Sequence, residues 1–180
     1  WKPPGVRFPI LSKTFTCTRW RSGMPADDRV EIGVISDTHG LLRPEAFSAL
    51  KGVDQIIHAG DVGNPEILSS LQRIAPVAAV RGNTDWGPWA RGLPSNEVVE
   101  VDGISIYVLH DQDDLDLSPE AAGFAAVITG HTHVPEERWE RGVLYLNPGS
   151  AGPIRGTKPV SVAILEIAGG VLRPRFVKLL

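Results

Sequence analysis

Short apolar segments recur from residue 30 onward, and most of them are followed directly by glycine and by carboxylate, amide or imidazole side chains. In the first half of the chain, the segments with the length and composition of buried strands are 30–36, 55–59 and 77–81. Helices are expected between them at 44–50 and 65–73, with Asn64 capping the second. Strands that alternate with helices predict a parallel sheet with right-handed crossovers.

The second half of the chain is rich in expected strands. Asp102-Gly103 is a two-residue hairpin signal between the strands 97–101 and 104–109. A short helix is expected at 118–122, capped by Ser118. The remaining expected strands are 125–129, 136–140, 143–146, 160–167 and 172–178. The predicted fold class is therefore α+β with an α/β front half, and two packed sheets with outer helices would bury both halves.

Charge is unevenly distributed along the 180 residues, a length that supports one sizeable core. Residues 1–23 carry five basic side chains and no acid, which leaves −8 on residues 24–180 of a chain whose net charge is −3. An acidic body is a poor match for long nucleic acid, because such binding relies on neutralising phosphates. No apolar stretch approaches the roughly 20 residues that span a bilayer, so we expect no membrane partner.

Residues 1–23 show no hydrophobic periodicity, and the only methionine, Met24, follows them. We interpret 1–23 as a leader of uncertain origin and 24–180 as the working domain. A transit peptide is the alternative for the leader, because it is basic and contains Ser and Thr. The single cysteine excludes an intramolecular disulfide and favours a reducing, cytoplasmic location.

Potential metal ligands stand at the ends of five expected strands. They are Asp37 and His39, Asp61, Asn83, His110, and His131 with His133. Ligands of open α/β sheets bind outside the carboxyl ends of the strands. The Asp-x-His and His-x-His spacings would place both side chains of each pair on the same side of an extended backbone. We therefore expect these residues to converge.

The donor types indicate which metals would bind. Carboxylate, imidazole and amide oxygen without thiolate suit Mn²⁺, Fe²⁺ or Zn²⁺ in an open catalytic site. A carboxylate such as Asp61 can bridge two cations. Asn83 would contribute a neutral oxygen, which leaves net positive charge for an anionic substrate.

Five motifs, in chain order, resemble the signature of calcineurin-like metallophosphoesterases. They are Asp37-x-His39, Gly60-Asp61, Gly82-Asn83-x-Asp85, His110, and Gly130-His131-x-His133. The chain's length and its Asn147-Pro148-Gly149-Ser150 segment are most similar to the small bacterial and archaeal phosphodiesterases of this superfamily. The resemblance covers residues 30–180, and five motifs in order make it highly specific.

The resemblance implies a four-layer αββα sandwich and two divalent metal ions, Mn²⁺ first and Fe²⁺, Zn²⁺ or Ni²⁺ as alternatives. It assigns the first ion to Asp37, His39, Asp61 and His133, and the second to Asp61, Asn83, His110 and His131. A hydroxide between the ions would hydrolyse small phosphodiesters. In this interpretation the catalytic residues are Asp37, Asp61, Asn83 and His110.

One position departs from the family pattern. Many members place a proton-donating histidine after the metal-binding Asn, and here that residue is Thr84, whose hydroxyl is a weak acid. Asp111 is an alternative donor, although a supporting or capping role is favoured. We therefore expect phosphodiesterase activity to exceed monoesterase activity.

Several neighbouring residues have two interpretations. Asp85 is expected to cap a turn or orient a ligand, and His58 to be a core histidine. Arg81 and Arg155 would contact substrate phosphate or else be surface residues. Trp86 and Trp89 would line the cleft or, as favoured here, serve packing or oligomer contacts.

Two other functions compete with a phosphodiesterase. The first is a non-catalytic metal-binding scaffold of the same fold, with the retromer scaffold subunit as precedent. The second is a nuclease, which the acidic body disfavours. A small phosphodiester substrate and a homo-oligomer complete the expected partners.

Overall fold

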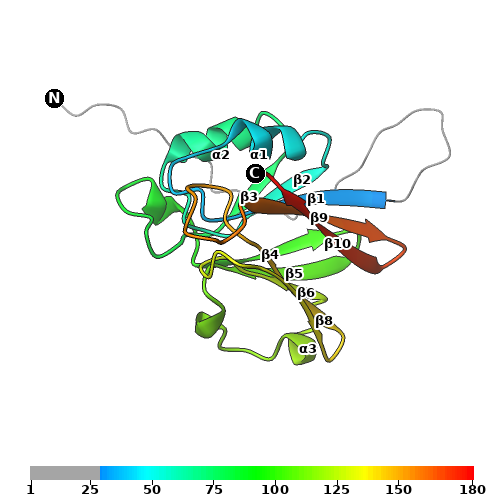
Figure 1. Cartoon of the computed structure of the whole chain (residues 1–180). Coiled ribbons are helices and arrows are strands. Elements are labelled where there is room, and N and C mark those ends of the chain that lie inside the picture. Colours follow the sequence, from blue (N-terminus) through cyan, green and yellow to red (C-terminus); the bar gives the residue numbers. More distant parts are fainter. Residues whose placement is uncertain (1–28) are drawn as a thin grey trace.

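The structure is a computed structural model that describes residues 29–180. The expected leader and the boundary at Met24 lie outside the described residues. Two mixed five-stranded sheets face each other, as Figure 1 shows, and this confirms the predicted fold class. None of the helices among residues 29–180 is both long enough and apolar enough to span a membrane.

The first sheet has the strand order β10-β9-β1-β2-β3. Its strands are β1 (Arg29–Ile35), β2 (Gln55–His58), β3 (Val77–Ala79), β9 (Ser161–Ala168) and β10 (Val171–Lys178). β1, β2 and β3 are parallel, as the alternation of strands and helices predicts, whereas β9 and β10 pair antiparallel. The last two strands of the chain therefore extend this sheet next to the first strand, with β9 beside β1 and β10 at the edge.

The second sheet has the order β4-β5-β6-β8-β7. Its strands are β4 (Asn96–Val101), β5 (Ile104–Leu109), β6 (Ala126–Ile128), β7 (Pro135–Glu140) and β8 (Val143–Pro148). The hairpin at Asp102-Gly103 joins β4 to β5, with a positive φ at both turn residues. β5, β6 and β8 run parallel, so this sheet also has several carboxyl ends at one edge.

The helices cover the two outer faces unequally (Figure 1). The first sheet is covered by α1 (Pro44–Ala49) and α2 (Pro65–Leu71), and the Asn64 side chain caps α2 by accepting from the Glu66 N–H. The second sheet is covered by only α3 (Pro119–Ala122) and the short 3₁₀ helix η2 (Gln112–Asp114). Ser118 precedes α3 but makes no capping hydrogen bond. The fourth layer is therefore thin.

Three apolar clusters hold these layers together. The largest lies between the sheets and includes Ile32, Ile106 and Leu165. The second packs the helices on the first sheet, and the third lies under the α3 segment, around Tyr107 and Val127. Successive residues of a strand point to opposite faces of its sheet, so one strand contributes side chains to two apolar clusters. This packing fixes the register of the strands and therefore the positions of their ends.

Candidate metal centre

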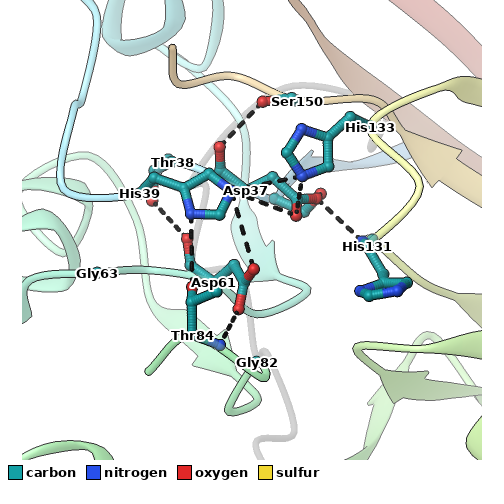
Figure 2. Close-up of polar contacts among 12 residues, drawn as sticks. Asp37, Thr38, His39, Asp61, Gly63, Gly82, Thr84, His131, His133 and Ser150 are labelled. Atoms are coloured by element: carbon teal, nitrogen blue, oxygen red, sulfur yellow. Dashed lines mark hydrogen bonds and ion pairs between the residues drawn. The ribbon is translucent and has the colours of Figure 1, made fainter. Parts of the chain in front are cut away.

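The strand ends that carry the predicted ligands meet at one edge of the paired sheets, on the left in Figure 1. The predicted ligands all lie in the segments that follow β1, β2, β3, β5 and β6. Figure 2 shows Asp37, His39, Asp61 and His133 close together, with the His131 ring to one side and its backbone N–H joined to Asp37. The structure thus brings together side chains from five segments of the chain.

The first set of donor atoms surrounds Asp37. His133 Nε2 lies 3.1 Å from Asp37 Oδ1, and His39 Nε2 lies 3.9 Å from the same oxygen. The two Nε2 atoms are 3.4 Å apart, and His39 Nε2 is 3.8 Å from Asp61 Oδ2. Asp37 Oδ1 is buried and accepts no hydrogen bond from any described residue. A buried carboxylate oxygen facing two imidazoles without a hydrogen-bond donor is the expected environment of a metal ligand.

The second set of donor atoms lies on the other side of Asp61. His110 Nε2 is 3.5 Å from Asp61 Oδ1 and 3.0 Å from Asn83 Oδ1. His131 Nδ1 lies 3.3 Å from Asn83 Oδ1. Asn83 Oδ1 thus provides a neutral oxygen between the two rings. On this side, Asp37, Asp61 and His110 offer ligand atoms that all lie within 4.8 Å of one another.

The spacing of these atoms fits coordination. For an ion with bonds of about 2.1 Å, neighbouring ligand atoms lie roughly 3.0–3.4 Å apart. The measured separations of 3.0–3.9 Å are close to this range in both sets. Asp61 directs Oδ2 to the first set and Oδ1 to the second, so one carboxylate belongs to both.

The local backbone differs from the one expected. Asp37, His39, Asp61, His131 and His133 all have φ between 46° and 66°, in the left-handed region. The prediction that each i, i+2 pair lies on an extended backbone is therefore wrong, and tight turns bring the pairs together instead. Non-glycine residues pay a conformational cost there, and such strain concentrates at functional sites.

Backbone hydrogen bonds between loops maintain these turns. Asp37 N–H donates to the Gly60 carbonyl at 3.0 Å, and His39 N–H donates to the Asp61 carbonyl at 2.9 Å. Asp85 accepts from the N–H groups of Val62, Gly63 and Gly82 at 2.7–3.2 Å. Asp85 thus ties the loop after β3 to the loop after β2.

The motif glycines allow close approach. A Cβ on Gly82 would lie 2.1 Å from both the backbone N and Oδ1 of Asp61. A Cβ on Gly60, whose φ is +89°, would lie 2.6 Å from His110 Nδ1. Any larger residue would therefore displace a ligand.

Two serines support Asp37 from behind. The Ser36 hydroxyl donates to Asp37 Oδ2 and the Ser150 hydroxyl to the Asp37 carbonyl. Asn147 Nδ2 donates to the Gly130 carbonyl at 2.6 Å and so holds the loop before His131. Ser36 was not predicted from the sequence, although its place directly before Asp37 could have indicated a supporting hydrogen bond.

Burial and hydrogen bonding tune the protonation of the ligands. Burial raises the pKa of the Asp37 carboxyl above its ordinary value. Burial also opposes ionisation of Asp61, but hydrogen bonds with His110 and the Thr84 N–H hold the pKa of that carboxyl well below its usual range. Burial lowers the pKa of His133 to about 4, and Arg155 adds to the shift. His133 is therefore neutral and able to coordinate near pH 7.

His110 is oriented by the backbone. Its Nδ1 lies 2.8 Å from the Ala59 carbonyl, which can only accept, so Nδ1 carries a proton and Nε2 faces the site. Burial opposes its charge, but the hydrogen bonds to Asp61 and Ala59 raise its pKa. A metal ion would replace the Nε2 proton.

The neighbouring residues occupy distinct places. The Thr84 N–H donates to Asp61 Oδ1 at 2.8 Å, and Thr84 Oγ1 is 3.4 Å from His39 Nδ1. Asp111 Oδ2 is 3.4 Å from His131 Nε2. His58 is buried in the core with Nε2 3.0 Å from Thr38 Oγ1. Arg81 lines an adjoining cavity rather than the metal centre itself.

An open cavity of about 300 Å³ lies over the donor sets. The lining residues include the exposed cations Arg155 and Lys158. The others are His39, Asp61, Asn83, Thr84, His131 and His133. Two cations in the lining favour an anionic ligand. The described residues can thus hold divalent ions below a space that suits a phosphate.

Two facing mixed sheets, with carboxylate, imidazole and amide donors at one edge, define a metal-binding protein of the phosphoesterase type. The chain belongs to the calcineurin-like phosphoesterase superfamily, whose domain matches residues 30–170. This confirms the family expected from the five motifs, which all lie within the matched residues.

Curated relatives include two probable metallophosphoesterases from archaea. The protein of Methanocaldococcus jannaschii is 43% identical over 132 residues, covering 66% of this chain and 67% of its own. The protein of Methanothermobacter thermautotrophicus is 36% identical over 159 residues, covering 82% of this chain and 91% of its own.

Solved structures share the fold. A predicted phosphoesterase from Streptococcus pneumoniae has a TM-score of 0.66 at 27% identity, over 85% of this chain and 91% of its own. An archaeal phosphodiesterase has a TM-score of 0.69 at 24% identity, over 82% and 100%. Vacuolar protein sorting 29 of Cryptosporidium parvum has a TM-score of 0.68 at 19% identity, over 84% and 98%. The last two comparisons support the fold alone.

Proposed function

We propose that this protein is a metal-dependent phosphodiesterase with a two-metal centre that acts on small phosphodiesters. The observation that carries the proposal is the placement of Asp61, whose two carboxylate oxygens face separate donor sets. In the proposed ligand assignment, the first ion is held by Asp37, His39, Asp61 and His133, and the second by Asp61, Asn83, His110 and His131. Mn²⁺ is the favoured ion, because these donors are oxygen and imidazole.

Bound divalent ions would lower the pKa of water and neutralise charge that develops on phosphate. The protein's own residues fix the geometry for that chemistry. The Thr84 N–H holds Asp61 Oδ1 in place, and the Ala59 carbonyl sets the tautomer of His110. Arg155 and Lys158 would attract the phosphate group and orient it.

The position of Thr84 supports a preference for diesters over monoesters. Thr84 Oγ1 lies 3.4 Å from His39 Nδ1, beside the ligands, but a hydroxyl does not protonate a leaving oxygen near neutral pH. We infer that turnover depends on the acidity of the leaving group.

Hydrolysis of bis(p-nitrophenyl) phosphate with Mn²⁺, compared with p-nitrophenyl phosphate, tests the proposal. We expect the diester to be preferred, chelation to abolish turnover, and Asp61→Asn to reduce it about a hundredfold or more. Gln72→Ala, an exposed change after α2, serves as the control. Preference for the monoester, or equal activity after chelation, would overturn the proposal.

The alternative is a non-catalytic metal-binding scaffold, which the likeness in fold to vacuolar protein sorting 29 supports. The described chain supplies a ligand-type side chain at all seven expected positions. A scaffold predicts metal binding without hydrolysis of any diester. Metal binding measured on the same sample as the hydrolysis assay therefore separates the two functions.

A further inference from the structure

A second cavity, of about 650 Å³, adjoins the proposed metal centre. It is lined by Arg81, Asn83, Trp86, Arg91, His110 and Asp114, among others. Its volume lies within the range of small-molecule sites, roughly 300–1,000 Å³. The proposed ligand positions do not explain why such a space should exist beside them.

The two cavities form consecutive parts of one cleft. Asn83 lines both, and His110, whose Nε2 is 3.0 Å from Asn83 Oδ1, lines the second. A phosphate placed over the donor sets would therefore direct one of its ester groups past Asn83 into the larger cavity. The chemistry of that cavity indicates which ester group fits.

Two arginines supply the cationic side chains of the cavity. Neither Arg81 nor Arg91 makes a side-chain hydrogen bond or ion pair with another described residue, and both are exposed. Their positions are set by the backbone, because the Arg81 N–H donates to the Pro94 carbonyl at 2.8 Å and Arg91 lies in the 3₁₀ helix η1 (Ala90–Gly92). Guanidinium groups are suited to the oxygens of a phosphate.

The cavity is also lined by the carboxylates of Asp85, Asp111 and Asp114, so its lining is not cationic overall. Asp85 accepts from three backbone N–H groups, and Asp111 contacts His131 and the Asp113 N–H. Within residues 29–180, none of the three forms an ion pair with Arg81 or Arg91. Both guanidinium groups are therefore available to an anionic ligand.

An aromatic wall completes the cavity. Trp86 is 78% exposed and lines the cavity, whereas Trp89 packs against the core cluster under α1 and α2. The expectation of a packing role therefore fits Trp89 but not Trp86. An exposed indole beside unpaired cations is a surface on which a planar base can stack.

From these features we propose that the larger cavity binds a nucleotide portion of the substrate, with the base on Trp86 and a second phosphate on Arg81 and Arg91. The inference rests on the proposed function, because the first phosphate must lie over the metal centre. The preferred substrate is then a diester of a nucleotide that carries an additional terminal phosphate. Simple diesters would occupy the metal centre alone.

Calorimetric titration of the Mn²⁺-loaded protein with three probes tests the inference. The probes are inorganic phosphate, thymidine 5′-monophosphate and thymidine 3′,5′-bisphosphate. We expect the monophosphate to bind more tightly than phosphate, and the bisphosphate to bind about tenfold more tightly than the monophosphate. The double variant Arg81→Ala/Arg91→Ala should bind the bisphosphate no more tightly than the monophosphate. Trp86→Ala should lose most of the affinity that the monophosphate gains over inorganic phosphate.

Arg73→Ala and Trp139→Ala are matched controls, since both side chains are exposed and line neither cavity. Equal affinity for mono- and bisphosphate, or a preference that survives the double arginine variant, would overturn the inference. The inference would also be overturned if Arg73→Ala lost as much of the preference for the bisphosphate as the double arginine variant does. Hydrolysis of bis(p-nitrophenyl) phosphate, measured in parallel, reports separately on the proposed function.

Discussion

At the scale of single residues, Thr84 is the position where this chain departs from the family pattern. Its N–H supports Asp61, but its side chain offers no acid for the leaving oxygen. Thr84→His keeps the backbone hydrogen bond and adds a proton donor. We expect it to accelerate hydrolysis of diesters with alkyl leaving groups by about tenfold or more, and p-nitrophenyl diesters much less.

Rates for a series of aryl and alkyl diesters measure this effect as a slope against leaving-group acidity. Thr84→Asn retains the N–H without supplying an acid, and it serves as the control. A uniform acceleration across the whole series would contradict the role given to position 84, because a general acid matters most where the leaving group is poor.

His58 makes a different prediction, on stability. It is fully buried beside Thr38, and burial lowers its pKa from 6.5 to about 3. Between these values the unfolded chain binds a proton that the folded chain does not, so stability falls as pH falls below about 6.5. At pH 5 this amounts to about 2 kcal/mol of unfolding free energy relative to pH 7.

His58→Gln removes this titration and keeps a polar group near Thr38. Urea unfolding is measured at pH 7 and pH 5 with chelator present. The unfolding free energy should therefore fall less between the two pH values in the variant than in the parent protein. The other histidines are the same in both proteins, so their contributions cancel in the comparison. An identical loss in the two proteins would show that His58 is not the group responsible.

At the scale of elements, the segments after the strands build the site, and their glycines are as important as their ligands. Gly82→Ala would place a methyl group 2.1 Å from Asp61 N and Oδ1. The carboxylate shared by both donor sets would have to move. We expect Mn²⁺ affinity to fall about ten- to a hundredfold, as measured by calorimetric titration.

Gly92→Ala is the matched control, because a Cβ there meets no atom within 4 Å. It should bind Mn²⁺ like the parent protein. Circular dichroism separates a local displacement of Asp61 from general unfolding in Gly82→Ala. Unchanged affinity in a folded Gly82→Ala protein would argue against Asp61 as a shared ligand.

The elements themselves were largely predictable from the sequence. Buried apolar runs predicted the strands, Asp102-Gly103 the hairpin, and Asn64 the start of α2, because these signals are local. The left-handed turns at Asp37, Asp61 and His131 were not predictable. Non-glycine residues rarely adopt them, and here loop-to-loop hydrogen bonds from distant strands impose them.

The thin fourth layer also depends on tertiary contacts. Leu115, Leu117 and Phe124, around α3, cover one patch of the second sheet with little regular helix. The short helix after Ser118 was predicted from the sequence, but the packing of these side chains on the sheet was not, because the segment is too short to show a hydrophobic periodicity. The proposed ligands were predicted from residue type and order, whereas the oxygen of Asp61 that faces each donor set could be assigned only from the coordinates.

At the scale of the whole molecule, the proposed metal centre lies between the two sheets. Asp37, His39 and Asp61 follow strands of the first sheet, and His110, His131 and His133 follow strands of the second. Ions bound between them stabilise only the folded chain. Mn²⁺ at 100 times its dissociation constant should raise the unfolding free energy by about 2.7 kcal/mol per site.

Thermal unfolding with Mn²⁺ and with chelator measures this stabilisation. Asp61→Asn should show a much smaller shift, because it weakens the ligand common to both sets. A shift of the same size in that variant would indicate that Mn²⁺ stabilises the protein through some other part of the chain.

The most direct test of a centre shared by two ions is a crystal structure of the Mn²⁺-loaded protein with anomalous diffraction. We expect two peaks about 3.5–4 Å apart, one on each side of the Asp61 carboxylate. A single peak, or peaks away from Asp37, Asp61 and His110, would contradict it.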